Sequence, residues 1–229
     1  MYDALADAIE TVNQRHDVRL LVLRAAGDAF AAGTDIHQFT DFRSADDGLA
    51  YERRLDAIVA RLEEVRVPTI AQVHGVAAGG GCVIALACDL RVCTPQAQFG
   101  VPIARTLGNC LSAANCARLV DVIGPAGTKD LLMTGRLIDV REAVSLGLAT
   151  RVAERDAIDG VVHELAQTIA ANAPLTILAA RETLRRLAQH RRLPANAIDD
   201  LIAACYTSAD FREGVTAFRE KRKPKFRGE

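Results

Sequence analysis

Apolar residues recur at every third or fourth position near the start of the chain, which is the spacing of one face of an α-helix. Residues 2–16 and 51–65 show this spacing and predict two amphipathic helices. Each is followed by an apolar run of strand length, at 20–23 and 69–76, which predicts a buried strand. A third apolar run, 82–88, directly follows three glycines and predicts a short buried helix.

The alternation of helices and strands continues through the first two thirds of the chain and then stops. The next expected elements are a strand at 89–93 and helices at 111–123, 127–133 and 140–146. Beyond residue 157 only helical patterns remain, at 158–169, from Pro174, at 198–205 and at 208–218. Strands that alternate with helices are typical of an α/β fold with mostly parallel pairing. We therefore divide the chain into an α/β core, residues 1–155, and a helical carboxyl-terminal region, residues 156–229.

The charge and composition exclude several classes of protein. The 229 residues include 28 basic and 29 acidic side chains and no Trp, so the formal net charge is −1. Such a chain offers neither the charge nor the stacking surface of a nucleic-acid-binding protein. The uncharged stretch 67–88 is long enough to cross a membrane, but Pro68 and the triplet Gly79-Gly80-Gly81 interrupt it. We expect no membrane segment.

The six cysteines predict neither a metal site nor a disulfide framework. They form no CxxC pair and have no histidine partners at zinc-site spacing. Most lie next to Ala, Val, Ile or Leu, where a free thiol packs as a small apolar side chain. The amino end has no apolar signal-peptide core. We expect a reduced, cytoplasmic protein without a bound metal.

Two loops after predicted buried strands present backbone N–H groups. One is the glycine triplet, where a helix begins, and the other is Gly33-Thr34-Asp35. The first N–H groups of a helix have no partner within the helix, and glycine lets a ligand approach the backbone closely. Two such N–H groups directed at one oxygen stabilise an oxyanion. The alternative interpretation of the triplet is that it only allows close packing.

The two loops and the sequence between them resemble the enoyl-CoA hydratase/isomerase family, or crotonase superfamily. The matching segments are 28–36, 67–71, 75–82, 86–91, 99–100, 107–108, 118–119, 134–136, 142–143, 147–148 and 218–222. The resemblance implies a spiral of ββα turns with a helical carboxyl-terminal region that forms trimers, or dimers of trimers. It implies an acyl-CoA substrate, with coenzyme A as part of the substrate and no separate cofactor. It also implies that the N–H groups of Thr34 and Gly80 bind the thioester carbonyl oxygen. The family's strand-rich segment before the first helix is expected to be missing, because this sequence begins in that helix.

The resemblance also indicates which residues surround the substrate. These are Ala32, Asp35, Ile36, Gly79, Val83, Ile103, Asn109, Cys110 and Lys221. Lys221 belongs to a basic run at the carboxyl end, which either contacts a phosphate of a neighbouring subunit's coenzyme or is a solvated tail.

Two positions depart from the family's hydratases. The hydratases carry glutamates where this chain has Val83 and Ile103. Water addition needs groups that transfer protons, so hydration by two glutamates and isomerisation by one are both disfavoured. Other branches of the family carry a carboxylate near the position of Ser112.

The remaining polar candidates for proton transfer are His37 and Ser112, each with a structural alternative. His37 lies close to Thr34 and titrates near neutral pH, or it is a surface histidine. Ser112 contacts substrate, or it caps the helix that follows. Asp35 binds substrate or holds its loop through the backbone.

Two classes of function remain open. The first is an enzyme that acts on an acyl-CoA thioester through the Thr34 and Gly80 N–H groups, by decarboxylation through an enolate, by thioester hydrolysis or by an isomerisation that uses His37. The second is a non-catalytic protein of the same fold that binds coenzyme A thioesters or serves in assembly. A dinucleotide-binding enzyme is excluded, because the glycines do not follow the GxGxxG spacing.

Overall fold

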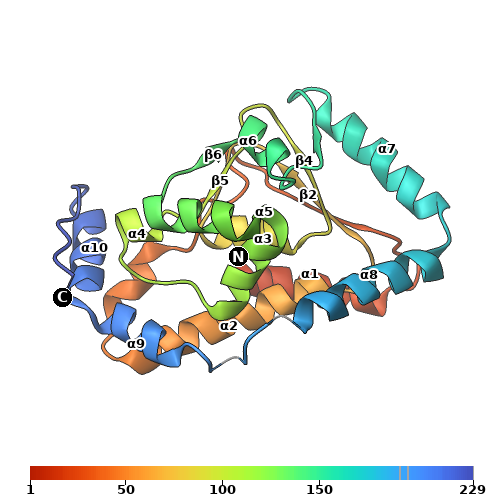
Figure 1. The fold of residues 1–229 in the computed structure, drawn as a ribbon. Helices are drawn as coiled ribbons and strands as arrows, with labels where there is room; N and C mark the ends of the chain where they lie inside the picture. The colour runs from red at the N-terminus through yellow and green to blue at the C-terminus, as the bar shows by residue number, and fades with distance from the viewer. Residues whose placement is uncertain (191, 195, 229) are drawn as a thin grey trace.

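The computed structural model describes residues 1–190, 192–194 and 196–228 (Figure 1). Helix α1 (Tyr2–Gln14) precedes strand β1 (Leu21–Arg24), and helix α2 (Ala45–Glu64) precedes strand β2 (Thr69–Val73). The predicted alternation is therefore confirmed. Helix α2 begins earlier than its apolar pattern, because Asp47 accepts a hydrogen bond from the backbone N–H of Ser44 (2.8 Å) and caps the first turn.

The apolar run 69–76 is two strands rather than one. Strand β2 ends at Val73, and β3 (Val76–Ala78) joins a different sheet. The turn between them contains Gly75, with φ of +61°, where a Cβ would lie 2.2 Å from the carbonyl oxygen of Asp28. Only glycine fits this turn, and the apolar residues around it hide it from a hydropathy pattern.

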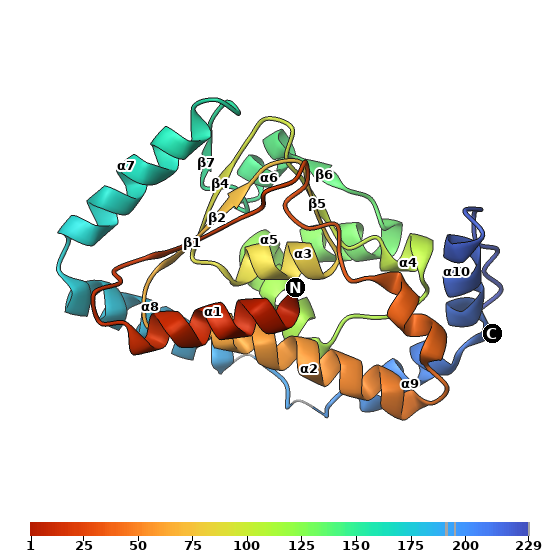
Figure 2. The same cartoon turned by 180° about the vertical axis from the view of Figure 1, so that it is seen from behind.

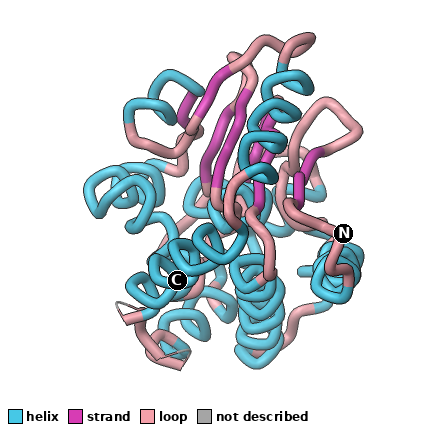
Figure 3. The backbone as a smooth tube through the Cα atoms, turned by 90° about the vertical axis from the view of Figure 1, so that its right-hand side faces the viewer, coloured by secondary structure: helices cyan, strands magenta, loops and turns pink. Residues whose placement is uncertain are grey.

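The strands form two small sheets (Figure 3). Four parallel strands form the larger one, in the order β1, β2, β4 (Leu90–Cys93) and β7 (Arg151–Val152). In the smaller sheet, β5 (Gln98–Gly100) lies between β3 and β6 (Ile138–Asp139), parallel to the first and antiparallel to the second. Parallel neighbours need crossover connections, and α2 provides the one from β1 to β2.

The remaining helices follow the predicted order. Helices α3 (Gly80–Ala87), α4 (Ile103–Thr106), α5 (Ala113–Thr134) and α6 (Val140–Ser145) belong to the part of the chain that also contains the strands. Two helices were expected where α5 lies, and Gly124, with φ of 70°, kinks α5 between them. Helices α7 (Ile158–Ala171), α8 (Pro174–Gln189), α9 (Asp199–Thr207) and α10 (Ala209–Arg219) follow the last strand found in the described residues. Ser208 caps α10 as predicted, since its side chain accepts from the N–H of Phe211.

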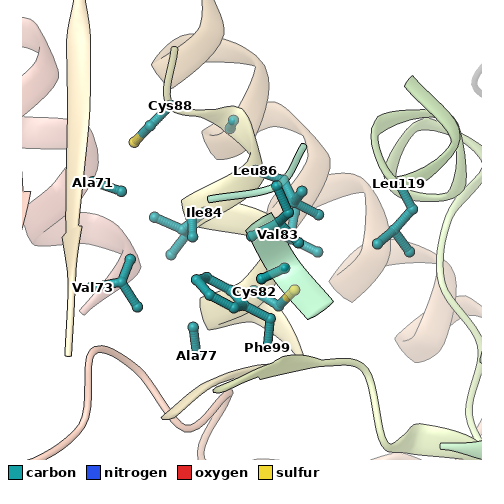
Figure 4. Close-up of a cluster of buried hydrophobic side chains, with 14 of the residues drawn as sticks. Ala71, Val73, Ala77, Cys82, Val83, Ile84, Leu86, Cys88, Phe99 and Leu119 are labelled. Carbon is teal, nitrogen blue, oxygen red and sulfur yellow. The ribbon is translucent and has the colours of Figure 1, made fainter. Parts of the chain in front are cut away.

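The helices surround an apolar core that α3 crosses (Figures 1 and 2). Val83 is fully buried there together with Leu86 and Leu119 (Figure 4). Helix α2 packs against α1, α3 and α9, so it lies between the core and the carboxyl-terminal helices. Of the helices within the described ranges, none combines the length and apolar character that a membrane span needs.

Candidate functional site

The two N–H-presenting loops meet beside the smaller sheet. The N–H of Ala31 donates to the carbonyl of Val76 (3.1 Å), and the N–H of Ala78 donates to the carbonyl of Ala31 (2.9 Å). Ala31 thus pairs with β3 as a parallel bridge. The chain continues from this bridge into Gly33 and Thr34, while β3 continues into Gly79 and Gly80. The pairing of residue 31 therefore places the two loops side by side.

The N–H groups of Thr34 and Gly80 have no hydrogen-bond acceptor within the described part of the chain. Gly80 is the first residue of α3, where the N–H has no partner in its own helix. By contrast, the N–H of Gly79 donates to the carbonyl of Gly100 (2.9 Å). A Cβ on Gly81 would lie 2.1 Å from the carbonyl oxygen of Ala31. Both interpretations of the glycine triplet therefore apply. Gly81 allows close packing, and Gly80 presents an N–H that has no acceptor among the described residues.

Three hydroxyl groups meet next to these N–H groups. The Thr34 hydroxyl lies 2.8 Å from that of Tyr2 and 2.6 Å from that of Tyr51. A Cβ on Gly80 would lie 2.1 Å from the Tyr2 hydroxyl oxygen. Burial raises the pKa of both tyrosines, so both phenols are neutral hydrogen-bonding groups. Helices α1 and α2 thereby fix the position of Thr34.

A cavity of about 250 Å³ opens at this point, bounded by both loops, α2, α4, the segment after α4, and Phe218 of α10. Figure 2 shows how α2 and α9 run below the loops, with α10 at their end. Seven of the residues predicted from the sequence line the cavity: Ala32, Thr34, Ile36, Gly79, Gly80, Ile103 and Asn109. Most of the lining is apolar, which suits an acyl chain.

The other predicted residues lie outside the cavity lining. Asp35 and His37 are exposed, and the Asp35 carboxylate accepts from the N–H of His37 (3.0 Å) to cap a short helix, η1 (Ile36–Asp41). The His37 ring meets the Phe218 ring edge-on, with 6.3 Å between centroids. Lys221 is exposed just after α10.

Three other predicted residues make hydrogen bonds or packing contacts within the protein: Ser112, Val83 and Cys110. The Ser112 hydroxyl donates to Asp56 (2.7 Å) and accepts from the N–H of Asn115 (3.2 Å), so it caps α5. Val83 is fully buried in the apolar core (Figure 4). Cys110 packs against a cluster that includes Tyr206 and Phe211. The contacts of Ser112 therefore agree with its structural alternative, in which it caps the helix that follows.

The cavity contains a carboxyl group that the sequence analysis missed. Glu52 on α2 lines the cavity and is only 2% exposed. Burial, together with the nearby charge of Asp56, raises its pKa to about 7, although a hydrogen bond from Tyr206 and the backbone N–H of Ser112 act in the opposite direction. A signal was present, because Glu52 lies at helical spacing from Leu55, Val59 and Leu62, in the apolar stripe of α2.

The Tyr206 hydroxyl joins the cavity wall to α9. It donates to Glu52 Oε1 (2.7 Å) and accepts from Asn109 Nδ2 (3.2 Å). Both Glu52 Oε2 and Asn109 Oδ1 are buried and have no hydrogen-bond partner in the described residues. The polar end of the cavity therefore has two unused acceptor atoms.

No group of His, Cys, Asp and Glu side chains suited to a metal ion occurs within the ranges that the structure covers. The six cysteines are free, and Cys82, Cys88 and Cys93 are buried.

Comparison with known proteins shows the family and the fold of the chain. The family model described as enoyl-CoA hydratase/isomerase matches residues 1–229. Crotonyl-CoA hydratase of Syntrophomonas wolfei is 32% identical over 224 residues, which is 97% of this chain and 85% of the relative. A crystal structure of an enoyl-CoA hydratase/carnithine racemase from Magnetospirillum magneticum is 34% identical, with a TM-score of 0.79, over 100% of this chain and 86% of that one. Methylmalonyl-CoA decarboxylase in complex with 2-nitronate-propionyl-CoA is 28% identical, with a TM-score of 0.91, over 100% of this chain and 88% of that one. The crotonase-like α/β fold expected from the sequence is thus confirmed, and the chain belongs to the enoyl-CoA hydratase/isomerase family.

Proposed function

We propose that this protein is an enzyme that binds an acyl-CoA thioester and stabilises its enolate through the N–H groups of Thr34 and Gly80. The observation that carries the proposal is a pair of N–H groups, on two adjacent loops, that have no acceptor among the described residues; Thr34 and Gly80, which bear them, line one largely apolar cavity. Each such donor contributes about 2.7–4 kcal/mol to transition-state stabilisation in well-studied enzymes. Coenzyme A is part of the substrate, and the proposed steps require no further cofactor.

Decarboxylation of an acyl-CoA with a carboxylate on its α-carbon is the reaction that the site supports best. The bond from the α-carbon to the carboxylate breaks, its electron pair enters the enolate, and carbon dioxide leaves without a base. Val83 is packed in the core, and Ile103 gives the cavity an apolar wall, so neither moves a proton. The likeness to methylmalonyl-CoA decarboxylase, with a TM-score of 0.91, adds support.

The first experiment compares two substrates. We expect carbon dioxide release from methylmalonyl-CoA or malonyl-CoA, measured together with the thioester product. We expect hydration of crotonyl-CoA, followed by loss of enoyl absorbance, to be slower than in a two-glutamate hydratase by roughly 10²–10⁴-fold. Hydration at ordinary hydratase rates contradicts the proposal. Tight acyl-CoA binding with no turnover favours a non-catalytic binding protein.

The second experiment adds a methyl group next to the Tyr2 and Thr34 hydroxyls with Gly80→Ala. The new Cβ would meet the Tyr2 hydroxyl, the movable end of a side chain, so we expect the variant to fold. We expect turnover to fall by roughly 10²-fold, because the displaced Tyr2 hydroxyl no longer holds Thr34, so its N–H loses its alignment with that of Gly80. The matched control is Gly160→Ala on α7, where a Cβ meets nothing within 4 Å. Equal turnover in both variants would exclude the Thr34/Gly80 pair.

We also propose that the protein assembles as a homotrimer through its carboxyl-terminal helices. Helix α8 supports this, because no residue in it is buried while Leu175, Leu178, Leu184 and Leu187 are exposed. A helix of this length is marginal without tertiary packing.

A further inference from the structure

We propose that Glu52 is the acid that delivers a proton to the α-carbon of the enolate. This inference rests on the proposed function, since it assigns the second half of the same reaction. It accounts for a carboxyl group at a position to which the family resemblance gave no role.

Glu52 lines the cavity that the two loops bound. It lies in the same cavity wall as Tyr51, whose hydroxyl contacts Thr34. In the described lining, Glu52 is the one carboxylic acid, and the only other titratable side chain is Tyr51. A proton that must reach the α-carbon within the cavity therefore has one carboxyl source.

The hydrogen bonds of Glu52 leave one oxygen available. Oε1 accepts from Tyr206, whereas Oε2 is buried and has no hydrogen-bond partner among the described residues. A buried polar atom without a partner is destabilising, so such atoms are expected where a ligand completes the site. A proton on Oε2 would have no protein acceptor, and the enolate carbon would provide one.

The ionisation of Glu52 suits this role. Its pKa is raised to about 7, mainly by burial, so a large fraction of the groups carries a proton near neutral pH. The titratable side chains that face Glu52 are Asp56, Tyr2, Tyr51, Tyr206, Cys110 and Cys116. None of them is a cation that would hold Glu52 ionised.

The step balances without another reactant. After carbon dioxide leaves, the enolate electron pair forms a bond from the α-carbon to the Glu52 proton, and the O–H bond of Glu52 breaks. The thioester carbonyl re-forms, and Glu52 remains as a carboxylate that accepts from the Tyr206 hydroxyl. A proton from solvent then restores the acid.

The alternative role for Glu52 is to fasten α2 to α9 through Tyr206. Glu52→Gln separates the two roles, because the Gln carbonyl still accepts from Tyr206 while the acid is lost. Tyr206→Phe does the opposite: it keeps the acid and removes the hydrogen bond that lowers the pKa of Glu52.

The experiment measures methylmalonyl-CoA decarboxylation in D₂O and the configuration of deuterium at the α-carbon of the product. For Glu52→Gln we expect kcat to fall by roughly 10²–10⁴-fold, KM to change little, and deuterium to enter both faces of the α-carbon. For Tyr206→Phe we expect the fall in activity at high pH to move to higher pH. The control is Glu164→Gln, an exposed residue of α7, with unchanged kcat and stereospecific deuteration.

The outcomes separate the two proposals. If the wild type releases carbon dioxide and Glu52→Gln keeps its kcat and stereospecificity, the role of Glu52 is overturned while the proposed function stands. An unshifted pH profile in Tyr206→Phe also counts against Glu52, even if Glu52→Gln does not fold. If the wild type neither releases carbon dioxide nor exchanges the α-protons of propionyl-CoA with D₂O, both proposals are overturned.

Discussion

Among single residues, Glu52 lowers the stability of the folded protein in a manner that depends on pH. Its pKa rises from the usual 4.5 to about 7 on folding. Between these values the folded state binds the proton more tightly than the unfolded state, so the free energy of unfolding falls as pH rises. The cost is absent below the unfolded pKa and complete above the folded pKa, where it reaches about 3 kcal/mol at most.

Glu52→Gln tests this cost without any substrate, because the amide copies the neutral acid and does not ionise. Urea denaturation of both proteins at several pH values should show their difference in unfolding free energy changing in favour of the variant. The expected change is about 3 kcal/mol between roughly pH 4 and pH 8. Glu164→Gln on the surface of α7 should show no comparable change. Parallel curves for wild type and Glu52→Gln would mean that Glu52 has an ordinary pKa in the fold.

At the scale of elements, the sequence predicted those helices and strands in which an apolar pattern repeats. It did not predict elements whose position depends on a single contact with a distant part of the chain. The helices at 2–16 and 51–65 were found because several turns share one apolar face. Strands β6 and β7 have two residues each, too few to show an alternation. The turn at Gly75 depends on the Asp28 carbonyl, a contact with a distant part of the chain.

The candidate site, like the fold, was only partly predictable from the sequence. The local turns indicated that the two loops present backbone donors, and the family resemblance assigned this role to Thr34 and Gly80, both of which line the cavity. Glu52 and Phe218 enter the site only when α2 meets the carboxyl-terminal helices, which no local pattern reveals. Even so, an acidic residue within the apolar stripe of α2 is a signal that sequence reasoning can use.

The contact between α2 and α9 depends on Gly48. A Cβ there would lie 2.4 Å from Cγ and 2.7 Å from Cβ of Tyr206, the base of that side chain, so α9 itself would have to move. We expect Gly48→Ala to lower the free energy of unfolding by about 1–3 kcal/mol, despite the roughly 1 kcal/mol that Ala gains as a helix former. The fall in activity at high pH should also move to higher pH, as in Tyr206→Phe, because the Tyr206 hydroxyl leaves Glu52.

Urea denaturation and the decarboxylation assay on the same sample measure both effects. Gly160→Ala in α7 has open space around the new methyl group and should be as stable as the wild type or more so. A Gly48→Ala protein with wild-type stability would show that the packing of α2 against α9 is loose.

At the scale of the whole molecule, some segments that match the family, such as 86–91, hold distant elements together and do not line the cavity. Asp89 accepts from the N–H of Thr69 (2.7 Å) and from Nε of Arg181 (2.8 Å), so it joins the larger sheet to α8. Arg91 is buried and donates to the carbonyls of Leu148 and Cys88. Helix α8 is thus fixed to the sheet by polar contacts while its leucines stay exposed.

Exposed leucines on a fixed helix favour contact with another copy of the chain, and this can be tested by charge. Leu175 on α8 is 78% exposed and Met133 on α5 is 77% exposed, so Asp is equally tolerable at both positions within one chain. We expect the wild type to be a trimer by light scattering, Leu175→Asp to dissociate to monomers, and Met133→Asp to remain trimeric. Burying a carboxylate without a partner at an interface costs several kcal/mol, which is enough to separate subunits.

Because the cavity lies within one chain, a dissociated Leu175→Asp protein that still binds acyl-CoA would show that assembly and substrate binding are separable. Dissociation by Met133→Asp alone would place the subunit contact on the α/β core instead.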